Sequence, residues 1–360
     1  MRLKRLEQWW RRLWIRLLVG AMRRSPGAPP DWESRPFRVL FLRHDRAGDM
    51  IVSTGVMRGI ARSHPTIAMD VLASPGNAPI LDANDYVGDV IVFDKKRVST
   101  YLPTALRLRR ARYDAVIDCM VTAPSVTTLL LILASGAGHR IGIAGRGNDA
   151  AFTLLVPADV PADAHMVDRI ADLARAFDVV LDAAARRPVL HLAAGERDWA
   201  ESAWGRAGEG RRALINISAG TAERTWAGDN YVAVMQHLRS RDAATTFRVI
   251  AAPSERARGE HVAHGGGGIF VSTPSIRHAL ALVATADFVL TPDTSIAHAA
   301  SAFQRPAVVL FARGKSERWR LYGTIGENVE HTELTLETLP VERVTGAVDL
   351  VLASSLTTRG

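Results

Sequence analysis

Short apolar segments rich in Val, Ile and Leu alternate with helical segments along most of this 360-residue chain. The first series of expected strands covers 39–42, 68–72, 90–93, 115–118 and 140–143. Helices are expected at 49–62, 100–111 and 122–135. Strands that are apolar on both faces must be covered on both faces, and the intervening helices can supply that cover. The pattern therefore predicts an α/β fold with parallel sheets.

The alternation stops and then restarts, which divides the chain. Strands resume at 213–217, 247–251, 287–291 and 307–311, with helices at 230–241, 276–285 and 295–303. A chain of this length also exceeds the usual range for one hydrophobic core. We therefore expect two Rossmann-like domains in series. The expected parts are a basic amphipathic helix and linker at 1–30, an N-terminal domain at 31–185, an interdomain linker at 186–211, a C-terminal domain at 212–335 and a C-terminal helix and tail at 336–360.

Nearly all of the net positive charge lies at the N-terminus. The formal charge is +8, and residues 1–24 hold eight basic side chains against one acid, Glu7. The rest of the chain is close to neutral, so a nucleic-acid-binding surface is not predicted. The only cysteine, Cys119, lies in an apolar segment, which predicts a buried thiol and excludes a disulfide framework or a multi-cysteine metal site.

The basic N-terminal segment also carries an apolar face. Its large apolar side chains are spaced for one side of a helix: Trp9, Trp10, Leu13, Trp14, Leu17 and Leu18. This combination predicts a helix that lies in the interface of an anionic membrane. Arginines interrupt it too often for a membrane span or a signal peptide. The alternative is a helix docked on the protein's own surface. Residues 25–30, rich in proline, then form a linker.

Polar loops follow several of the expected strands. The first strand leads into Arg43-His-Asp-Arg-Ala-Gly-Asp49, where Asp49 lies near the start of a helix. An acid there can be a helix cap, or it can accept a proton from a hydroxyl nucleophile. The absence of a G-x-G-x-x-G motif after this strand weighs against a dinucleotide oxidoreductase.

In the second half, three loops have groups suited to a nucleotide. Thr221 and Arg224 lie in a loop whose small residues, hydroxyls and guanidinium suit a diphosphate. Glu255 can hold ribose hydroxyls or simply begin a helix. The turn between 286–290 and 306–311 offers an anion the start of a helix. Its candidate contacts are Asp293, Thr294, Ser295 and His298, although a single histidine of this kind is more often packed than a ligand.

Together these loops resemble those of the heptosyltransferase-type inverting glycosyltransferases, glycosyltransferase family nine. The resemblance runs from about Arg38 to the C-terminal helical region and is strongest at 38–51 and at 293–298. It implies the two-domain GT-B architecture, in which the N-terminal domain binds the acceptor and the C-terminal domain binds a nucleotide-sugar. The chain departs from the family pattern at three positions: Ser295 for a usual glycine, Arg224 for lysine and Ala227 for proline.

The resemblance also implies roles for individual residues. Asp49 matches the general base, and Glu255 matches the acid that holds the ribose. The residues that it places on the donor phosphates are Arg43, Arg224, Thr221, Asp293, Thr294, Ser295 and His298. Arg140 and Arg146 are placed near the acceptor, although Arg146 can equally be a solvated loop arginine.

The function implied is transfer of a sugar, with heptose from ADP-heptose as the first choice, onto a lipopolysaccharide-core or related lipid-linked glycan. No cofactor is expected, and no metal, because the chain shows no Asp-x-Asp motif serving a diphosphate. Location on the inner face of the cytoplasmic membrane follows from a lipid-linked acceptor. The alternatives are a transferase of the same fold that uses a UDP- or GDP-hexose, and a non-catalytic, membrane-associated nucleotide-sugar-binding protein.

Overall fold

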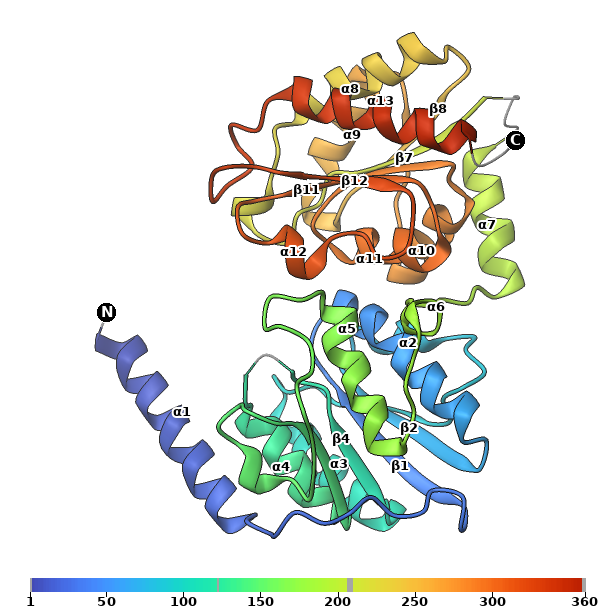
Figure 1. The fold of residues 1–360 in the computed structure, drawn as a ribbon. Coiled ribbons are helices and arrows are strands. Elements are labelled where there is room, and N and C mark those ends of the chain that lie inside the picture. The colour runs from blue at the N-terminus through green and yellow to red at the C-terminus, as the bar shows by residue number, and fades with distance from the viewer. Residues whose placement is uncertain (1, 122, 206–209, 358–360) are drawn as a thin grey trace. The chain divides into compact units, whose positions relative to one another are not determined.

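The computed structural model describes residues 2–121, 123–205 and 210–357, with side chains left out at 2–8, 11, 356 and 357. Within it the chain divides into two compact units, with the boundary between Arg186 and Arg187. Parts of the expected terminal and linker segments, residues 1, 206–209 and 358–360, lie outside the described residues, as does Thr122. Each unit is an α/β layer structure and is described by itself (Figure 1).

Unit 1 contains a parallel sheet with helices on both faces. Its strands are β1 (Phe37–Arg43), β2 (Ile67–Ala73), β3 (Val90–Val92), β4 (Ala115–Asp118), β5 (His139–Ile143) and β6 (Leu154–Val156). Its helices are α1 (Arg2–Ala21), α2 (Ala47–Ser63), α3 (Tyr101–Ala111), α4 (Val126–Ser135), α5 (Met166–Ala171) and α6 (Ala183–Arg186). Its short 3₁₀ helices are η1 (Ala78–Leu81), η2 (Val98–Thr100), η3 (Asp149–Ala151) and η4 (Asp172–Phe177).

The strand order in this sheet is β3-β2-β1-β4-β5-β6, and every described pairing is parallel. The central strand β1 is almost wholly buried, which explains its continuous apolar sequence. On one face, α2 packs with α5, α6 and η4. On the other face, α4 packs against both α3 and α1, and their inner side chains share one core with Leu40, Leu42 and Val116 of the sheet.

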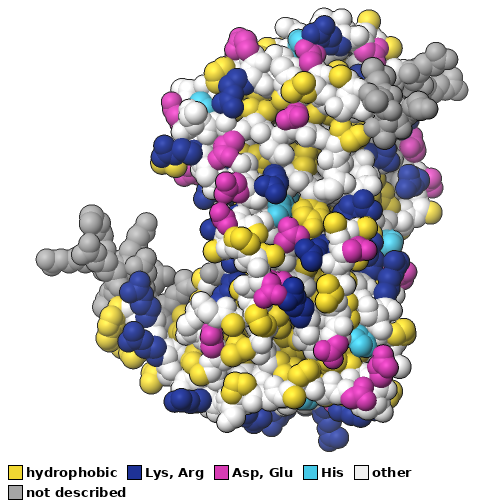
Figure 2. Space-filling view, in the orientation of Figure 1, with side chains coloured by type: hydrophobic (Ala, Val, Ile, Leu, Met, Phe, Trp, Pro, Cys, Tyr) yellow, Lys and Arg dark blue, Asp and Glu magenta, His cyan; other side chains and the backbone are white. Residues whose placement is uncertain are grey.

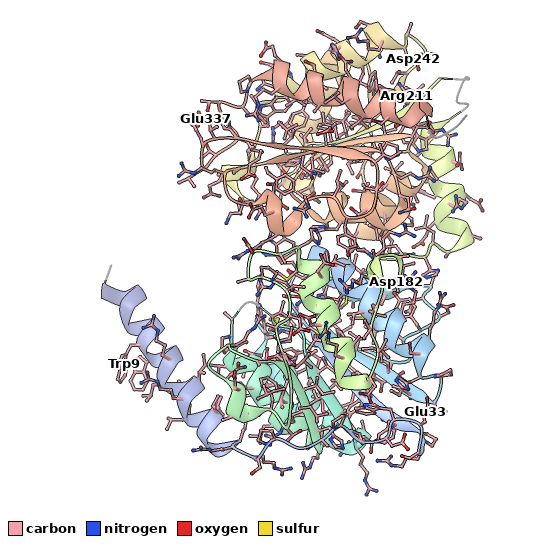
Figure 3. The ribbon with its side chains drawn as sticks, viewed as in Figure 1. Trp9, Glu33, Asp182, Arg211, Asp242 and Glu337 are labelled. Atoms are coloured by element: carbon pink, nitrogen blue, oxygen red, sulfur yellow. The ribbon has the colours of Figure 1, made fainter. Side chains whose placement is uncertain are left out.

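Helix α1 has two apolar sides rather than one. Ile15, Leu18 and Val19 pack against the core beneath α4, and Met22, just after the helix, is buried. Trp9, Trp10, Trp14 and Leu17 remain exposed on the other side, and Leu13 is half-buried. Trp9 lies clear of the rest of unit 1 (Figure 3). Docking on the protein's own surface therefore occurs, and Leu18, which we expected on the Trp side, belongs to the docked side.

The proline-rich segment after α1 is attached to unit 1. The Gly27 N–H donates to the Thr153 carbonyl at 2.8 Å, and Trp32 is buried against Phe177 with its indole N–H on the Ala176 carbonyl. These contacts fix the course of the chain from α1 into β1.

Unit 2 has the same kind of architecture. Its strands are β7 (Arg212–Asn216), β8 (Thr246–Ile250), β9 (Ile269–Phe270), β10 (Phe288–Pro292), β11 (Ala307–Phe311) and β12 (Gly326–Glu330). Its helices are α7 (Ala194–Trp204), α8 (Gly228–Arg241), α9 (Arg256–Gly265), α10 (Ile276–Thr285), α11 (Ser295–Phe303), α12 (Ser316–Trp319) and α13 (Val341–Thr357), with 3₁₀ helices η5 (Ala222–Arg224) and η6 (Pro253–Glu255). The strand order is β12-β11-β10-β7-β8-β9, again with parallel pairings.

Two segments expected outside the second domain are built into it. Helix α7, in the expected linker 186–211, packs against α10, and its Trp204 is buried with the indole N–H on the Thr285 hydroxyl at 2.9 Å. Helix α13, in the expected tail, packs against α8 and β12 and buries Val344, Val348 and Val351 in the core. Helix α7 was expected in the linker because few of its residues are buried and most of the others are polar, whereas α13 lies beyond the last strand of the expected alternation. Among the described residues, no helix is long and apolar enough to cross a membrane.

Candidate functional site

Both sheets have the strand order of a doubly wound fold, and such folds bind ligands where the order reverses, beyond the carboxyl ends of the strands. In unit 1 this point lies between β1 and β4, and in unit 2 it lies between β7 and β10. The predicted residues Asp49, Arg224 and Asp293 all follow one of these four strands. The fold therefore gathers the sequence candidates into one cluster in each unit.

In unit 1 the cluster is organised by Arg43, the last residue of β1. Its side chain is 2% exposed, and its guanidinium donates to the Cys119 carbonyl after β4 and to the Asp49 carbonyl at 2.9 Å. It also lies 3.3 Å from the Asp49 carboxylate and 3.4 Å from that of Asp45. Burial lowers the pKa of Arg43, but the charges of Asp45, Asp49, Cys119 and Asp118 together outweigh it and the net shift is upward. The guanidinium is thus turned inward and fixes the acids, instead of facing a donor phosphate as we expected.

Asp49 lies in the first turn of α2, and its side chain is 20% exposed. It does not cap the helix, since Arg46 is the N-cap residue and makes no side-chain cap bond. One carboxylate oxygen contacts Arg43, and the partial exposure leaves the group accessible to a substrate. This placement fits a proton acceptor better than a helix cap.

Two further acids surround Arg43, and the sequence did not single them out. Asp118 is buried at the end of β4, and burial raises the pKa of its carboxyl to about 6 against the attraction of Arg43. Burial likewise raises the pKa of Asp45 to about 6, with a further contribution from Asp49. In the sequence, only the positions of Asp45 after β1 and Asp118 at the end of β4 could have indicated these two acids, and acids at such positions are common.

Buried polar side chains hold the loop after β1 in place. Asn77 donates to the Arg43 carbonyl at 2.9 Å, and the Ser74 hydroxyl donates to the Asp45 carbonyl at 3.0 Å. His44 contacts the Thr128 hydroxyl of α4 at 3.2 Å, and burial lowers its pKa to about 4, so the ring is neutral at pH 7. The loop is thus tied to the chain after β2 and to α4.

Arg146 lies in the loop after β5, at the carboxyl edge of the sheet. With Arg169 and Asp172 it lines a cavity of about 280 Å³. Burial and the charge of Arg169 lower the pKa of Arg146, whereas Asp118 and Asp149 attract its charged form. One of its nitrogens, Nη1, is buried without a hydrogen-bond acceptor among the described residues. Arg146 is therefore a half-buried loop arginine, and its place near the acceptor stays a prediction.

Arg140, the other predicted acceptor residue, lies elsewhere. It pairs with Val116 in the register of β4 and β5, so its side chain points toward the core that α3, α4 and α1 cover. It is 5% exposed, and its Nε and Nη2 atoms have no acceptor among the described residues. Burial and the neighbouring Arg24 lower its pKa. This position is three residues before the end of β5, so we do not place it with Asp49.

In unit 2 the cluster is organised by Asn216, at the end of β7. Its amide donates to the Thr291 hydroxyl at 2.9 Å and to the Thr294 hydroxyl at 3.2 Å, which joins the loops after β7 and β10. Thr294 is the N-cap of α11, and its hydroxyl accepts from the Ile296 N–H. Thr294 and Ser295 are half-buried at the start of this helix, where backbone N–H groups favour an anion.

Arg224 reaches across from the loop after β7 to the loop after β10. It donates to the Asp293 carbonyl at 2.8 Å and lies 3.0 Å from the Asp293 carboxylate. Its side chain is 25% exposed, whereas Asp293 is buried. Asp293 therefore orients the guanidinium, and the accessible part of Arg224 remains beside the start of α11.

Ser295 replaces the usual glycine without backbone strain. It is the first residue of α11 and does not have the positive φ that would favour glycine. His298 lies one turn further into the helix, is buried, and contacts the Trp319 ring at 5.6 Å between centroids. His298 is therefore packed against its neighbours one turn after the start of α11.

The two remaining predicted residues, Glu255 and Thr221, follow β8 and β7 at the same edge of this sheet. Glu255 ends η6 after β8, and its carboxylate is held by Arg258 at 2.6 Å while about a quarter of the side chain stays exposed. Thr221 is exposed and follows Gly220, whose φ of +70° is a backbone conformation that favours glycine. Among the described residues, no group of three or more His, Cys, Asp or Glu side chains is arranged to hold a metal ion.

Comparison with known proteins agrees with this fold. Residues 104–345 match the model of glycosyltransferase family 9 (heptosyltransferase). A glycosyl transferase family 9 structure from Veillonella parvula DSM 2008 aligns with a TM-score of 0.77 at 14% identity, covering 91% of this chain and 99% of that one. A search of curated proteins found no match.

Two structures from E. coli also align closely. ADP-heptose lps heptosyltransferase II has a TM-score of 0.69 at 18% identity, with 88% of this chain and 99% of that chain covered. Heptosyltransferase WaaC with ADP has a TM-score of 0.70 at 17% identity, with 87% and 99% covered. At these identities the likeness establishes the fold, and the two α/β units are those of a GT-B architecture.

Proposed function

The chain belongs to glycosyltransferase family 9 and is a glycosyltransferase, and we propose that it transfers heptose from an ADP-linked donor to a hydroxyl of a lipid-linked glycan. The observation that carries this proposal is the pair of clusters at the strand-order reversals. One cluster presents an accessible carboxylate, and the other presents a fixed guanidinium at a helix start. Two structural relatives, an ADP-heptose lps heptosyltransferase and a heptosyltransferase with ADP, support heptose and ADP as the first choices.

The proposed reaction is a single displacement at the anomeric carbon of the donor sugar. Asp49 accepts the proton of the acceptor hydroxyl while that oxygen forms a bond to the anomeric carbon. The bond from this carbon to the diphosphate oxygen breaks, and the electron pair leaves with the diphosphate. One displacement of this kind inverts the anomeric centre. Asp49 needs to be held in place for this role, and the contact with Arg43 provides that.

The leaving diphosphate is the second charged group in the reaction. We propose that Arg224 and the start of α11 stabilise the charge that develops on it, with Thr294 and Ser295 nearest. Glu255 would hold the ribose hydroxyls, and Thr221 would line the same edge. Asp293 acts through Arg224 by orienting it. This set of groups supplies positive charge and N–H donors without requiring a metal ion.

For the acceptor we propose an anionic glycan. The cavity beside Arg146 and Arg169 lies in the same unit as Asp49. Burial and the charge of Arg169 lower the pKa of Arg146, so a bound anion would stabilise the charged form of this side chain. A phosphate or carboxylate on a core sugar would supply that charge. Such an acceptor is lipid-linked, so we also propose that the enzyme works peripherally on the inner face of the cytoplasmic membrane through residues 1–24.

The decisive test is Asp49→Asn, assayed by mass spectrometry with ADP-heptose and the lipid-linked acceptor. Loss of a general base typically lowers turnover by about 10²- to 10⁴-fold, whereas ADP affinity should stay near that of the native chain. Asp85→Asn changes an exposed acid of the same unit and serves as the matched control. Near-native turnover by the Asp49 variant would remove this residue from the role of base.

A second measurement addresses the donor. Thermal shifts with ADP, UDP and GDP distinguish the ADP-linked sugar from the alternative of a UDP- or GDP-linked hexose, since at equal concentration the ligand that binds more tightly stabilises the fold more. The largest shift should come from ADP. A larger shift with UDP or GDP would keep the transferase and replace the donor.

A further inference from the structure

Three helices of unit 1 form one layer whose outer side is apolar. Helix α4 lies in the middle and packs against α3 on one side and α1 on the other. Leu108 of α3, Leu129 and Ile132 of α4, and Leu18 of α1 face the same core, so all three helices cover the same face of the sheet. Their opposite sides therefore face outward together.

The outward positions hold large apolar side chains where a soluble surface would have polar ones. Leu130 and Leu133 of α4 are 41% and 50% exposed, and Leu102 and Leu106 of α3 are 68% and 46% exposed. Helix α1 contributes the exposed face described above, with Trp14 53% exposed. Isolated exposed leucines are ordinary, but a row across three adjacent helices marks an interaction surface. We call this row the α3–α4–α1 face.

Most of the exposed charged side chains on and next to these helices are basic: Arg12 and Arg16 of α1, Arg109 and Arg110 of α3, and Lys95 and Lys96 before α3. The nearby acids Asp89 and Asp94 lie beside basic partners, Arg107 at 3.1 Å and Arg97 at 3.4 Å. Apart from Glu7, the sequences of the three helices contain no acid. Where α1 is visible in the space-filling view, hydrophobic and basic side chains lie next to each other (Figure 2). Apolar side chains bordered by Lys and Arg, with Trp at the edge, match the interface of an anionic bilayer.

We propose that the α3–α4–α1 face is a single membrane-docking surface that seats unit 1 on an anionic phospholipid bilayer. Helix α1 is then one edge of a preassembled surface and not a separate anchor on a flexible linker. This inference rests on the proposed lipid-linked acceptor for its purpose, but the surface itself is defined without it. A bilayer is favoured over a second copy of the chain because the basic border would repel itself in a symmetric dimer.

The position of α4 connects this surface to the candidate base. The inner side of α4 carries Thr128, which contacts His44 in the loop that leads to Asp49. The outer side of the same helix carries Leu130 and Leu133. One short helix thus separates the docking surface from the loop after β1, which would bring a membrane-borne acceptor near that loop.

The test compares three double variants of the full chain by vesicle flotation. Leu130→Gln with Leu133→Gln alters α4 only, and Trp10→Gln with Trp14→Gln alters the outer side of α1 while keeping its docked side. Leu334→Gln with Leu350→Gln removes two similarly exposed leucines from unit 2 and is the matched control. The probe is vesicles of equal parts phosphatidylcholine and phosphatidylglycerol, with pure phosphatidylcholine for comparison.

The α4 variant and the α1 variant should each bind the anionic vesicles about 10- to 100-fold more weakly, because each loses the burial of two large apolar side chains. The control should bind as the native chain does, and added salt should weaken native binding. Native affinity in the α4 variant would overturn the proposal and leave α1 as a lone anchor. Equal native binding to pure phosphatidylcholine would overturn its electrostatic part. A native dimer that the α4 variant converts to monomers would assign the face to a second copy.

A labelling experiment checks the contact directly. Cys119 is fully buried, and burial raises the pKa of its thiol, so a cysteine introduced at position 133 can be labelled selectively with an environment-sensitive dye. Vesicles should shift the emission of dye on Leu133→Cys to the blue and leave dye on Leu350→Cys unchanged. No shift at 133 would refute the inference, while transfer to a water-soluble acceptor fragment would show that the proposed activity stands independently.

Discussion

Asp118 shows how a single residue near the candidate base affects the pH dependence of stability. Its carboxyl is buried, its pKa is raised to about 6 mainly by that burial, and one of its oxygens accepts from the Met120 N–H at 2.9 Å. In the unfolded chain the pKa is about 3.9. Between these two values the folded chain binds more protons than the unfolded one, so the free energy of unfolding falls as pH rises through this window.

Replacing Asp118 by Asn should flatten that dependence. The amide oxygen can still accept from Met120, while the buried charge disappears. We expect the variant to be more stable than the native chain by about 1 to 3 kcal/mol at neutral pH, and to lose the advantage below about pH 4. Urea unfolding across this range measures it, with the exposed Asp85→Asn as control. A variant that is less stable at neutral pH would show that ionised Asp118 is favourable.

A second prediction concerns the effect of replacing Arg140 on stability. Its guanidinium is buried with Arg24 nearby, and two of its nitrogens have no acceptor among the described residues. Replacing a buried charge by a well-packed apolar side chain is often neutral or stabilising. Arg140→Met should therefore raise the free energy of unfolding by about 1 to 4 kcal/mol. If Arg140 instead serves the acceptor, calorimetry will show no gain and the KM for the acceptor will rise.

Residue types near the site could be anticipated from the sequence, but their orientation could not. Position alone put Asp49 and Arg224 in loops that follow expected strands, one in each half of the chain. Arg43 was expected to face a phosphate, yet pleating turns its side chain inward to Cys119 and the acids. Asp118 was not predicted, because the sequence of β4 does not show that this strand lies next to β1, where the strand order reverses.

At the scale of elements, α1 is the most informative case. Helical spacing predicted an amphipathic helix with a Trp and Leu face, and in the structure residues 2–21 are helical with Trp9, Trp10, Trp14 and Leu17 exposed. It could not separate the two apolar sides, because Leu18 lies at the border of the exposed set and only the contact with α4 assigns it to the docked side. Helix α7 was expected only as part of the linker 186–211, since its few buried residues, such as Trp204, interrupt an otherwise polar segment.

Disrupting the docked side of α1 should detach it without unfolding the sheet. Leu18→Asp places a charge where α1 meets the core, so we expect fast hydrogen exchange in residues 9–21 and unchanged exchange in β1 and β4. Leu17→Asp changes the neighbouring exposed position and is the matched control. Equal protection of α1 in both variants would mean that the helix is held by something other than this packing. Deleting residues 1–24 is a poorer experiment, because it would also uncover the apolar core under α4.

At the scale of the whole molecule, the restart of the alternation correctly predicted two parallel sheets. The edge strands β6, β9 and β12 were not expected, because they are short or polar and gain their strand form from pairing with a neighbour. The equal strand order of the two sheets was not readable either. The strand order depends on which face of the sheet each connecting helix crosses. The periodicity of apolar residues does not indicate that face.

The division into two units predicts where a nucleotide acts. ADP alone should slow hydrogen exchange at 218–227 and 293–298 in unit 2 and leave 44–49 in unit 1 unchanged. Arg224→Ala should weaken ADP binding about 10- to 100-fold, the loss expected for a hydrogen bond to a charged group. Arg197→Ala, an exposed residue of α7, is the control. Protection centred on 44–49 would move the nucleotide site to unit 1.

The hydrogen bonds that Asn77 and Ser74 donate to the loop after β1 affect the entropy of substrate binding. Asn77 is fully buried, and its amide is committed to the carbonyl of Arg43. The loop therefore loses its conformational freedom when the chain folds and not when a substrate arrives. Binding at this loop should carry little ordering entropy, and calorimetry of acceptor binding should show a small entropic penalty that grows when Asn77 is replaced by alanine.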